Sequence, residues 1–198
     1  MSTEIEALKQ EERNFRQAGD AAGLAECLGK QAAALMGDGN HDEALLKLKE
    51  QEKVCRRSGD ERGLSVSLGN QAVISNTKGD FDAALTALAE SERLCRGSNS
   101  YELPRCLAYK GVVLRKKGET LPALQAFREA TGLFAELGAA DEVVKSLINS
   151  AMIVADDLGK PQDGIIFAEE AHRIACQTNS YMAPRTESSL AYIRSLMA

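Results

Sequence analysis

The chain of 198 residues is 44% hydrophobic and 27% charged, with a formal net charge of −5. This length and composition suit one globular domain or one array of repeats, and they exclude a mainly disordered chain. The negative charge argues against a nucleic-acid partner, because affinity for a phosphate backbone depends on clustered lysine and arginine. With no long apolar stretch and a charged N-terminus, we predict a cytoplasmic protein with no membrane partner.

The first segment, residues 1–19, is rich in helix-forming residues and predicts one helix. Its apolar residues Ile5 and Leu8 match Leu45 and Leu48 of a later helix. No partner helix precedes it in the sequence, so we expect this helix to cap an array with a polar outer face.

Four similar blocks follow, at residues 20–59, 60–98, 99–138 and 139–178. A short motif marks each block: L-G-K-Q-A at 28–32, L-G-N-Q-A at 68–72, L-A-Y-K-G at 107–111 and L-I-N-S-A at 147–151. The motif therefore returns after 40, 39 and 40 residues. A fixed period of this size is the sequence signature of a repeat architecture.

Each block is predicted to be a pair of antiparallel helices joined by a short connection. A glycine ends the first segment, at Gly39, Gly79, Gly118 and Gly159. Five residues later comes a small residue, Ala44, Ala84, Ala123 or Gly164, which opens an apolar stripe with helical spacing. Earlier small residues form a second row, at Ala32, Ala72, Gly111 and Ala151. These rows should let the paired helices approach closely. Candidate N-caps for the second helices are Asn40, Asp80 and Thr120.

A seven-residue motif stands at the joint between blocks, N-S-Y-E-L-P-R at 99–105 and N-S-Y-M-A-P-R at 179–185. We interpret it as a structural joint in which the Asn and Ser cap helices and the Tyr covers the junction. The last segment, 179–198, carries Leu190, Ile193 and Met197 at helical spacing. It is predicted to be a second capping helix.

The third block shows a known family pattern in Gly111, Gly118, Ala123, Phe127 and Ala130. This pattern resembles the tetratricopeptide repeat (TPR). The period near 40 is similar to that of kinesin light chains, the LGN/Pins adaptors, rapsyn and bacterial signalling arrays. The resemblance covers almost the whole chain. It implies an all-α fold, a single right-handed α-solenoid of antiparallel helix pairs over 1–198, with about ten helices and capping half repeats at both ends.

Function in such arrays belongs to the concave face, and the resemblance implies that the first helix of each pair lines it. The candidate peptide-binding groove comprises Lys30, Asn70, Val73, Asn76, Tyr109, Val112, Arg115, Lys116 and Asn149. Amides can bond to the backbone of an extended peptide, valines offer shallow apolar pockets, and the cations attract acidic side chains. In the alternative interpretation, Asn70 and Asn149 only cap or crosslink neighbouring helices.

We therefore predict a non-enzymatic scaffold that binds a peptide or protein segment of some acidic character. The alternative is a self-assembly module, a homo-oligomer through its end helices, or a fragment of a longer repeat-containing signalling protein. No cofactor or metal is expected, because His41 and His172 lack ligands at metal-site spacing and no phosphate loop or nucleophile elbow occurs.

The five cysteines are expected to be reduced. Four of them fall on two repeat rows, Cys55 with Cys95 and Cys27 with Cys106. Small buried packing positions explain both rows, since free cysteine is often buried. A redox or metal role for Cys95 and Cys106 is the alternative.

Overall fold

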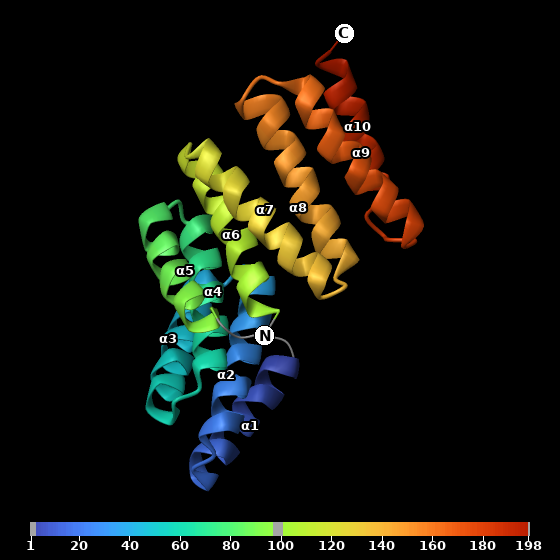
Figure 1. Cartoon of the computed structure of the whole chain (residues 1–198). Helices are drawn as coiled ribbons and strands as arrows, with labels where there is room; N and C mark the ends of the chain where they lie inside the picture. The colour runs from blue at the N-terminus through green and yellow to red at the C-terminus, as the bar shows by residue number, and fades with distance from the viewer. Residues whose placement is uncertain (1–2, 97–100, 198) are drawn as a thin grey trace. The chain divides into compact units, whose positions relative to one another are not determined.

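The computed structural model describes residues 3–96 and 101–197 (Figure 1). Within these ranges the chain forms ten α-helices and one π-helical turn, and no strand. The predicted all-α fold is therefore confirmed. The chain divides into two compact units, Met1–Glu102 and Leu103–Ala198.

The first unit is built from successive helices that pack against their neighbours in the sequence. They are α1 (Thr3–Ala18), α2 (Ala21–Gly37), α3 (His41–Ser58), α4 (Glu61–Thr77) and α5 (Phe81–Cys95). The most extensive packing joins α2 to α3 and α4 to α5. Connections of a few residues make these partners antiparallel, as predicted.

The second unit repeats this arrangement. It comprises α6 (Glu102–Lys117), α7 (Thr120–Glu136), α8 (Ala140–Met152), the π-turn η1 (Ile153–Asp157), α9 (Pro161–Gln177) and α10 (Ala183–Ser195). Helix α8 packs against both α7 and α9, and α10 packs against α9 (Figure 1). We call α2, α4, α6, α8 and α10 the first-type helices, and α1, α3, α5, α7 and α9 the second-type helices.

The predicted caps have mixed outcomes. The Asp80 side chain accepts a hydrogen bond from the Ala83 amide at 3.1 Å, as an N-cap does. Asn40 occupies the N-cap position of α3, but its side chain makes no capping bond. The prediction for Thr120 is wrong, because α7 already begins at this residue and Glu119 stands at the N-cap.

Both rows of small residues are buried where helices approach closely. At Gly111, an added Cβ would lie 2.8 Å from Cε2 of Phe127, a side chain that is only 1% exposed. The phenyl ring of α7 therefore occupies the space that a larger residue on α6 would need.

The π-turn at Ile153–Asp157 has a cause in the sequence. Ala72 and Gly79 are seven residues apart, whereas the equivalent Ala151 and Gly159 are eight residues apart. The fourth block thus holds one extra residue before its glycine, and the wider π-helical turn that follows α8 accommodates it.

This turn explains why Gly164 stands where the other blocks have alanine. A Cβ at Gly164 would lie 2.8 Å from the Ala151 carbonyl oxygen and 2.9 Å from the Ala155 amide nitrogen. These are backbone atoms, which cannot rotate away as the end of a side chain can. Glycine is thus required by the close approach of α9 to the end of α8.

Gly164→Ala is expected to lower the free energy of unfolding of the second unit by about 1–3 kcal/mol, because the new methyl group overlaps backbone. Gly132→Ala on α7 is the matched control, since no atom lies within 4 Å of its added Cβ. At this position the better helix propensity of alanine should raise the free energy of unfolding by up to about 1 kcal/mol. Urea unfolding followed by circular dichroism measures both changes, and a Gly164→Ala variant as stable as the parent would contradict this explanation.

A repeated ion-pair network joins the second-type helices of the first unit, and sequence analysis missed it. Arg16 pairs with Glu12 at 2.7 Å and also with Glu50 of α3. Forty residues later, Arg56 pairs with Glu52 at 2.9 Å and with Glu90 of α5 at 2.8 Å. The sequence did contain a signal for this network, because Arg16 and Arg56 are 40 residues apart, as are Glu12 and Glu52.

The row of Cys27 and Cys106, which has Ser67 and Ser146 in the other two blocks, also contributes hydrogen bonds. The Cys27 thiol donates to the Leu8 carbonyl at 3.1 Å, and the Ser67 hydroxyl donates to the Leu48 carbonyl at 2.8 Å. Each bond joins a first-type helix to the second-type helix before it. In these two blocks the residue at this position therefore acts as a hydrogen-bond donor as well as being small.

Candidate interaction surface

In the first unit, the predicted groove residues lie on α2 and α4. Asn70, Val73 and Asn76 are half-buried on one side of α4. The Asn76 side-chain oxygen is buried, and among the described residues it has no hydrogen-bond partner. On α2, Lys30 is exposed but pairs with Glu26 at 2.7 Å. The α4 face therefore offers amides and a valine, while the charge of Lys30 is largely balanced.

In the second unit, four of the predicted residues lie on α6. Tyr109 and Lys116 are exposed, and Val112 is half-buried. Lys116 makes no ion pair within the part of the chain that the structure describes. Asn149 lies on α8, where its amide donates to the Lys145 carbonyl of the same helix at 2.9 Å. This bond lies inside one helix, so it neither caps α8 nor crosslinks it to a neighbouring helix.

Arg115 is held in an ion-pair network that sequence analysis missed. Its Nε lies 2.6 Å from Oδ2 of Asp157 and its Nη2 lies 3.1 Å from Oδ1. A second carboxylate, that of Asp156, lies 3.6 Å away and accepts a hydrogen bond from the Tyr192 hydroxyl at 3.0 Å. This bond raises the pKa of the Tyr192 phenol. The π-turn thus supplies two carboxylates that link α6 to α10, and Arg115 is not a free cation.

The nine predicted groove residues are divided between the units. Lys30, Asn70, Val73 and Asn76 belong to the first unit, and Tyr109, Val112, Arg115, Lys116 and Asn149 belong to the second. Each set lies on first-type helices of its own unit. The structure therefore presents two candidate surfaces, one in each unit.

The second copy of the N-S-Y motif lies at the joint between α9 and α10, but the cap positions of these helices belong to Thr178 and Met182, not to Asn179 and Ser180 as predicted. Asn179 has a left-handed backbone with φ of 51°, and the Ser180 hydroxyl accepts from the Met182 amide at 3.0 Å. The same hydroxyl bonds to Asp141 at the start of α8. The Lys145 ammonium lies 5.7 Å from the centre of the Tyr181 ring, a cation–π contact. In the first copy, Asn99 and Ser100 lie outside the described residues.

Four of the five thiols are buried, and the His172 imidazole bonds to a buried hydroxyl. Cys27, Cys55, Cys95 and Cys106 are buried, and Cys176 is exposed. Burial raises the pKa of Cys55 to about 11, which leaves little reactive thiolate near neutral pH. His172 bonds through Nδ1 to the buried Thr186 hydroxyl at 2.8 Å. Among the described residues, no group of three metal-ligating side chains could hold a metal ion, and no helix is long and apolar enough to cross a membrane.

Comparison with known proteins shows the fold. No family model matches the chain, and no curated protein matches it. A solved structure of BtubC (BKLC) from P. vanneervenii matches with a TM-score of 0.85 at 14% identity, over 98% of this chain and 82% of that one. A putative kinesin light chain from Podosopora anserina with nearly identical TPR-like repeats matches with a TM-score of 0.73 at 13% identity, over 86% and 85%.

A Rap protein, solved in complex with competence and sporulation factor, is also similar. Its TM-score is 0.68 at 13% identity, over 96% of this chain and 58% of that one. These likenesses show that the chain has the TPR-like helical-repeat fold, as the resemblance in the sequence predicted.

Proposed function

We propose that this chain of TPR-like fold is a non-enzymatic scaffold that binds a peptide or protein segment on its first-type helices. The proposal includes a cytoplasmic location. The observation that carries it is the α4 face, where the half-buried Asn70 side chain makes no hydrogen bond to any described residue. Such an amide beside the half-buried Val73 suits the backbone and side chains of an incoming peptide.

The likeness to the Rap protein gives independent support. That protein was solved with competence and sporulation factor bound to it, so a helical array of this fold accommodates a separate factor. At this low sequence identity, only the fold can be inferred from the Rap protein. The ligand of this chain is therefore argued from its own residues.

For the second unit, we propose a ligand segment with some acidic character. Arg115 is paired with Asp157, so the attraction rests on Lys116, which is exposed at the end of α6. Tyr109 and Val112 supply adjoining apolar surface on the same helix. A single unpaired cation speeds the association of an acidic ligand and fixes its alignment more than it raises the affinity.

Self-assembly through the end helices is less well supported. The exposed residues of α1 include Glu6, Gln10, Arg13 and Asn14. Those of α10 are mostly polar, as at Arg185, Glu187, Ser188 and Arg194, although Tyr192 is also exposed. Polar outer faces are typical of capping helices, which protect the ends of an array from stacking. Light scattering that shows a mass rising with concentration would favour assembly instead.

Peptides selected from a random phage-displayed library against the whole chain test the proposal. Asn70→Ala/Val73→Ala alters the first unit, and Tyr109→Ala/Lys116→Glu alters the second. We expect at least one of these variants to weaken the selected peptides by about tenfold or more, because few residues carry most of the binding energy. The control Thr86→Ala/Arg128→Glu, exposed on second-type helices, should bind like the parent. Peptides that bind both groove variants as tightly as the parent would refute the assignment.

A further inference from the structure

Three exposed cations lie in one row on the second-type helices of the first unit. They are Arg13 of α1, Lys53 of α3 and Arg93 of α5, and each is 40 residues after the one before it. A repeat places equivalent residues at equivalent positions on successive helices, so the three side chains face the same side of the unit. We call these three residues the basic row.

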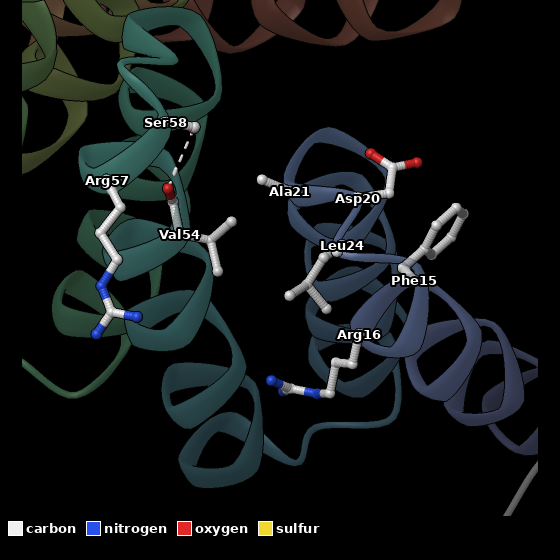
Figure 2. A pocket seen from close by; sticks show the side chains of 9 residues that line it. Phe15, Arg16, Asp20, Ala21, Leu24, Val54, Arg57 and Ser58 are labelled. Carbon is white, nitrogen blue, oxygen red and sulfur yellow. Dashed lines mark hydrogen bonds between the residues drawn. The ribbon is translucent and has the colours of Figure 1, made fainter.

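Ion pairs hold the three helices beside one another next to the basic row. Arg16 extends from α1 towards α3 (Figure 2), where it pairs with Glu50, and Arg56 of α3 pairs with Glu90 of α5 at 2.8 Å. A pocket of about 400 Å³ beside Leu24 opens between the ends of α1 and α3, and Arg16 lies at its edge (Figure 2). Neighbouring cations of the row are therefore about one helix spacing apart, on the order of 10 Å.

The basic row makes no ion pair of its own within the described residues. Arg13 donates a hydrogen bond to the uncharged side chain of Gln10 at 3.1 Å. Arg93 has a carboxylate three residues earlier, that of Glu90, but Arg56 already binds it. The hydrogen bond from Arg56, together with the charges of Arg56 and Arg93, lowers the pKa of Glu90. This single carboxylate lies near two cations and cannot balance both.

The exposed surface around the row is also positive. One helical turn to either side of Lys53 are Lys49 and Arg57, which are exposed and make no ion pair within the described part of the chain. Arg57 points to the outer side of α3, away from Asp20 (Figure 2). The exposed Glu11 of α1 lies on the face that is buried in α3 and α5, so it does not join this surface.

Helix dipoles account for only part of this charge. Cations stabilise a helix near its C-terminus, but the effect falls off within the last turn. Arg93 lies in the last turn of α5. Arg13 and Lys53 stand five residues before the ends of α1 and α3, which is beyond the last turn. The row therefore offers positive charge that nothing in the described structure uses.

We propose that the basic row binds an extended acidic segment of a partner protein, at a surface separate from the α4 face. The carboxylates of this segment stand at every third residue. A polyproline II chain has three residues per turn and rises about 3.1 Å per residue, so these carboxylates recur on one side about every 9 Å. This repeat matches the spacing of the row. A nucleic acid fits less well, because each strand carries a phosphate about every 3.4 Å along the axis and some phosphates would lie against Glu50 and Glu90.

The test uses the whole ¹⁵N-labelled chain at low ionic strength, because salt screens exposed charges. Three synthetic peptides are compared, with the sequences Gly-Glu-Pro-Ser-Glu-Pro-Ser-Glu-Pro-Ser-Gly, Gly-Pro-Ser-Pro-Glu-Glu-Glu-Ser-Pro-Ser-Gly and Gly-Lys-Pro-Ser-Lys-Pro-Ser-Lys-Pro-Ser-Gly. We expect the first peptide to cause saturable shifts of the Arg13, Lys53 and Arg93 amides. It should bind at least about threefold more tightly than the second, which has the same composition, and the lysine peptide should cause no shift. No saturable shift with the first peptide, or equal binding of the second, would overturn the inference.

Charge changes locate the site. Lys53→Glu should weaken binding of the first peptide by about fivefold or more, whereas Lys160→Glu, an equal change at an exposed position of the second unit, should have less than about a twofold effect. Arg13→Gln and Arg93→Gln should each weaken binding, because the segment crosses all three helices. Equal weakening by Lys160→Glu, or no effect of the two outer variants, would overturn the role of the row.

Two further measurements separate this surface from other partners and from the proposed function. Asn70→Ala/Val73→Ala, which alters the α4 face, should bind the first peptide like the parent, and weaker binding would place the peptide there and overturn the row. A chain that binds a single-stranded oligonucleotide or phosphatidylserine vesicles through the row, but not the first peptide, would overturn the acidic protein partner. Either of these outcomes leaves the proposed function standing.

Discussion

Ala84→Phe is expected to lower the free energy of unfolding of the first unit by about 3 kcal/mol, the upper part of the usual range for overpacking. Ala84 is 0% exposed on α5, which packs extensively against α4. Interiors are close-packed, so a phenyl ring there must push the two helices apart. For a unit of about 100 residues, a loss of this size lowers Tm by more than about 10 °C.

Thr86→Phe is the matched control, because Thr86 lies two residues along the same helix and is exposed. The same ring should leave Tm nearly unchanged there. The Tm values of the parent, Ala84→Phe and Thr86→Phe chains are measured by thermal unfolding followed by circular dichroism at 222 nm, with ~10 μM protein. An Ala84→Phe variant that melts with the parent would refute the close packing of the small-residue rows.

The second large effect concerns pH and Glu12, whose side chain is only 13% exposed. Burial by itself would raise the pKa of Glu12, but hydrogen bonds from Lys47, Arg16 and Gln31 outweigh it and lower the pKa from 4.5 to about 2. The unfolded chain therefore binds a proton at higher pH than the folded chain. The stabilisation is complete above pH 4.5 and is lost as the pH falls towards 2.

Glu12→Gln should accordingly destabilise the first unit at pH 7 by about 2 kcal/mol, and by much less near pH 2. Urea unfolding of variant and parent at both pH values measures this difference. Glu11→Gln, at the exposed neighbouring position, is the control and should have a small effect at both. If the Glu12→Gln variant were destabilised equally at both pH values, the loss of stability would not be caused by the charged network around Glu12.

The helix pairs could be predicted because their signals are local and repeated. Glycine after the first helix, as at Gly79 with φ of 80°, reflects the left-handed turn that ends it. The small residues at Ala44 and Ala84 recur because every pair meets the same packing constraint. A pattern repeated four times specifies the helices even where a single block is ambiguous.

The extra residue between Ala151 and Gly159 was visible in the spacing, but its consequence was not. An insertion can be absorbed by a loop or by a π-turn, and only the packed helix shows which. Here the turn places Asp157 where it accepts a hydrogen bond from Arg115, and Asp156 where it accepts one from Tyr192. The predicted free cation at Arg115 is therefore an ion-paired residue.

The sequence alone established the period and the helix pairs, and the family resemblance only implied the helices from which a ligand would be recognised. Tertiary structure decided which of those side chains remain available. Lys30 and Arg115 are paired, Asn149 bonds to its own helix, and the Asn76 side-chain oxygen is buried, without a hydrogen-bond partner among the described residues. The pocket beside Leu24 likewise appears only when α1, α2 and α3 are packed together. The physical reason is that helix formation depends on neighbours within a few residues, whereas ion pairs and cavities depend on distances between helices about 40 residues apart.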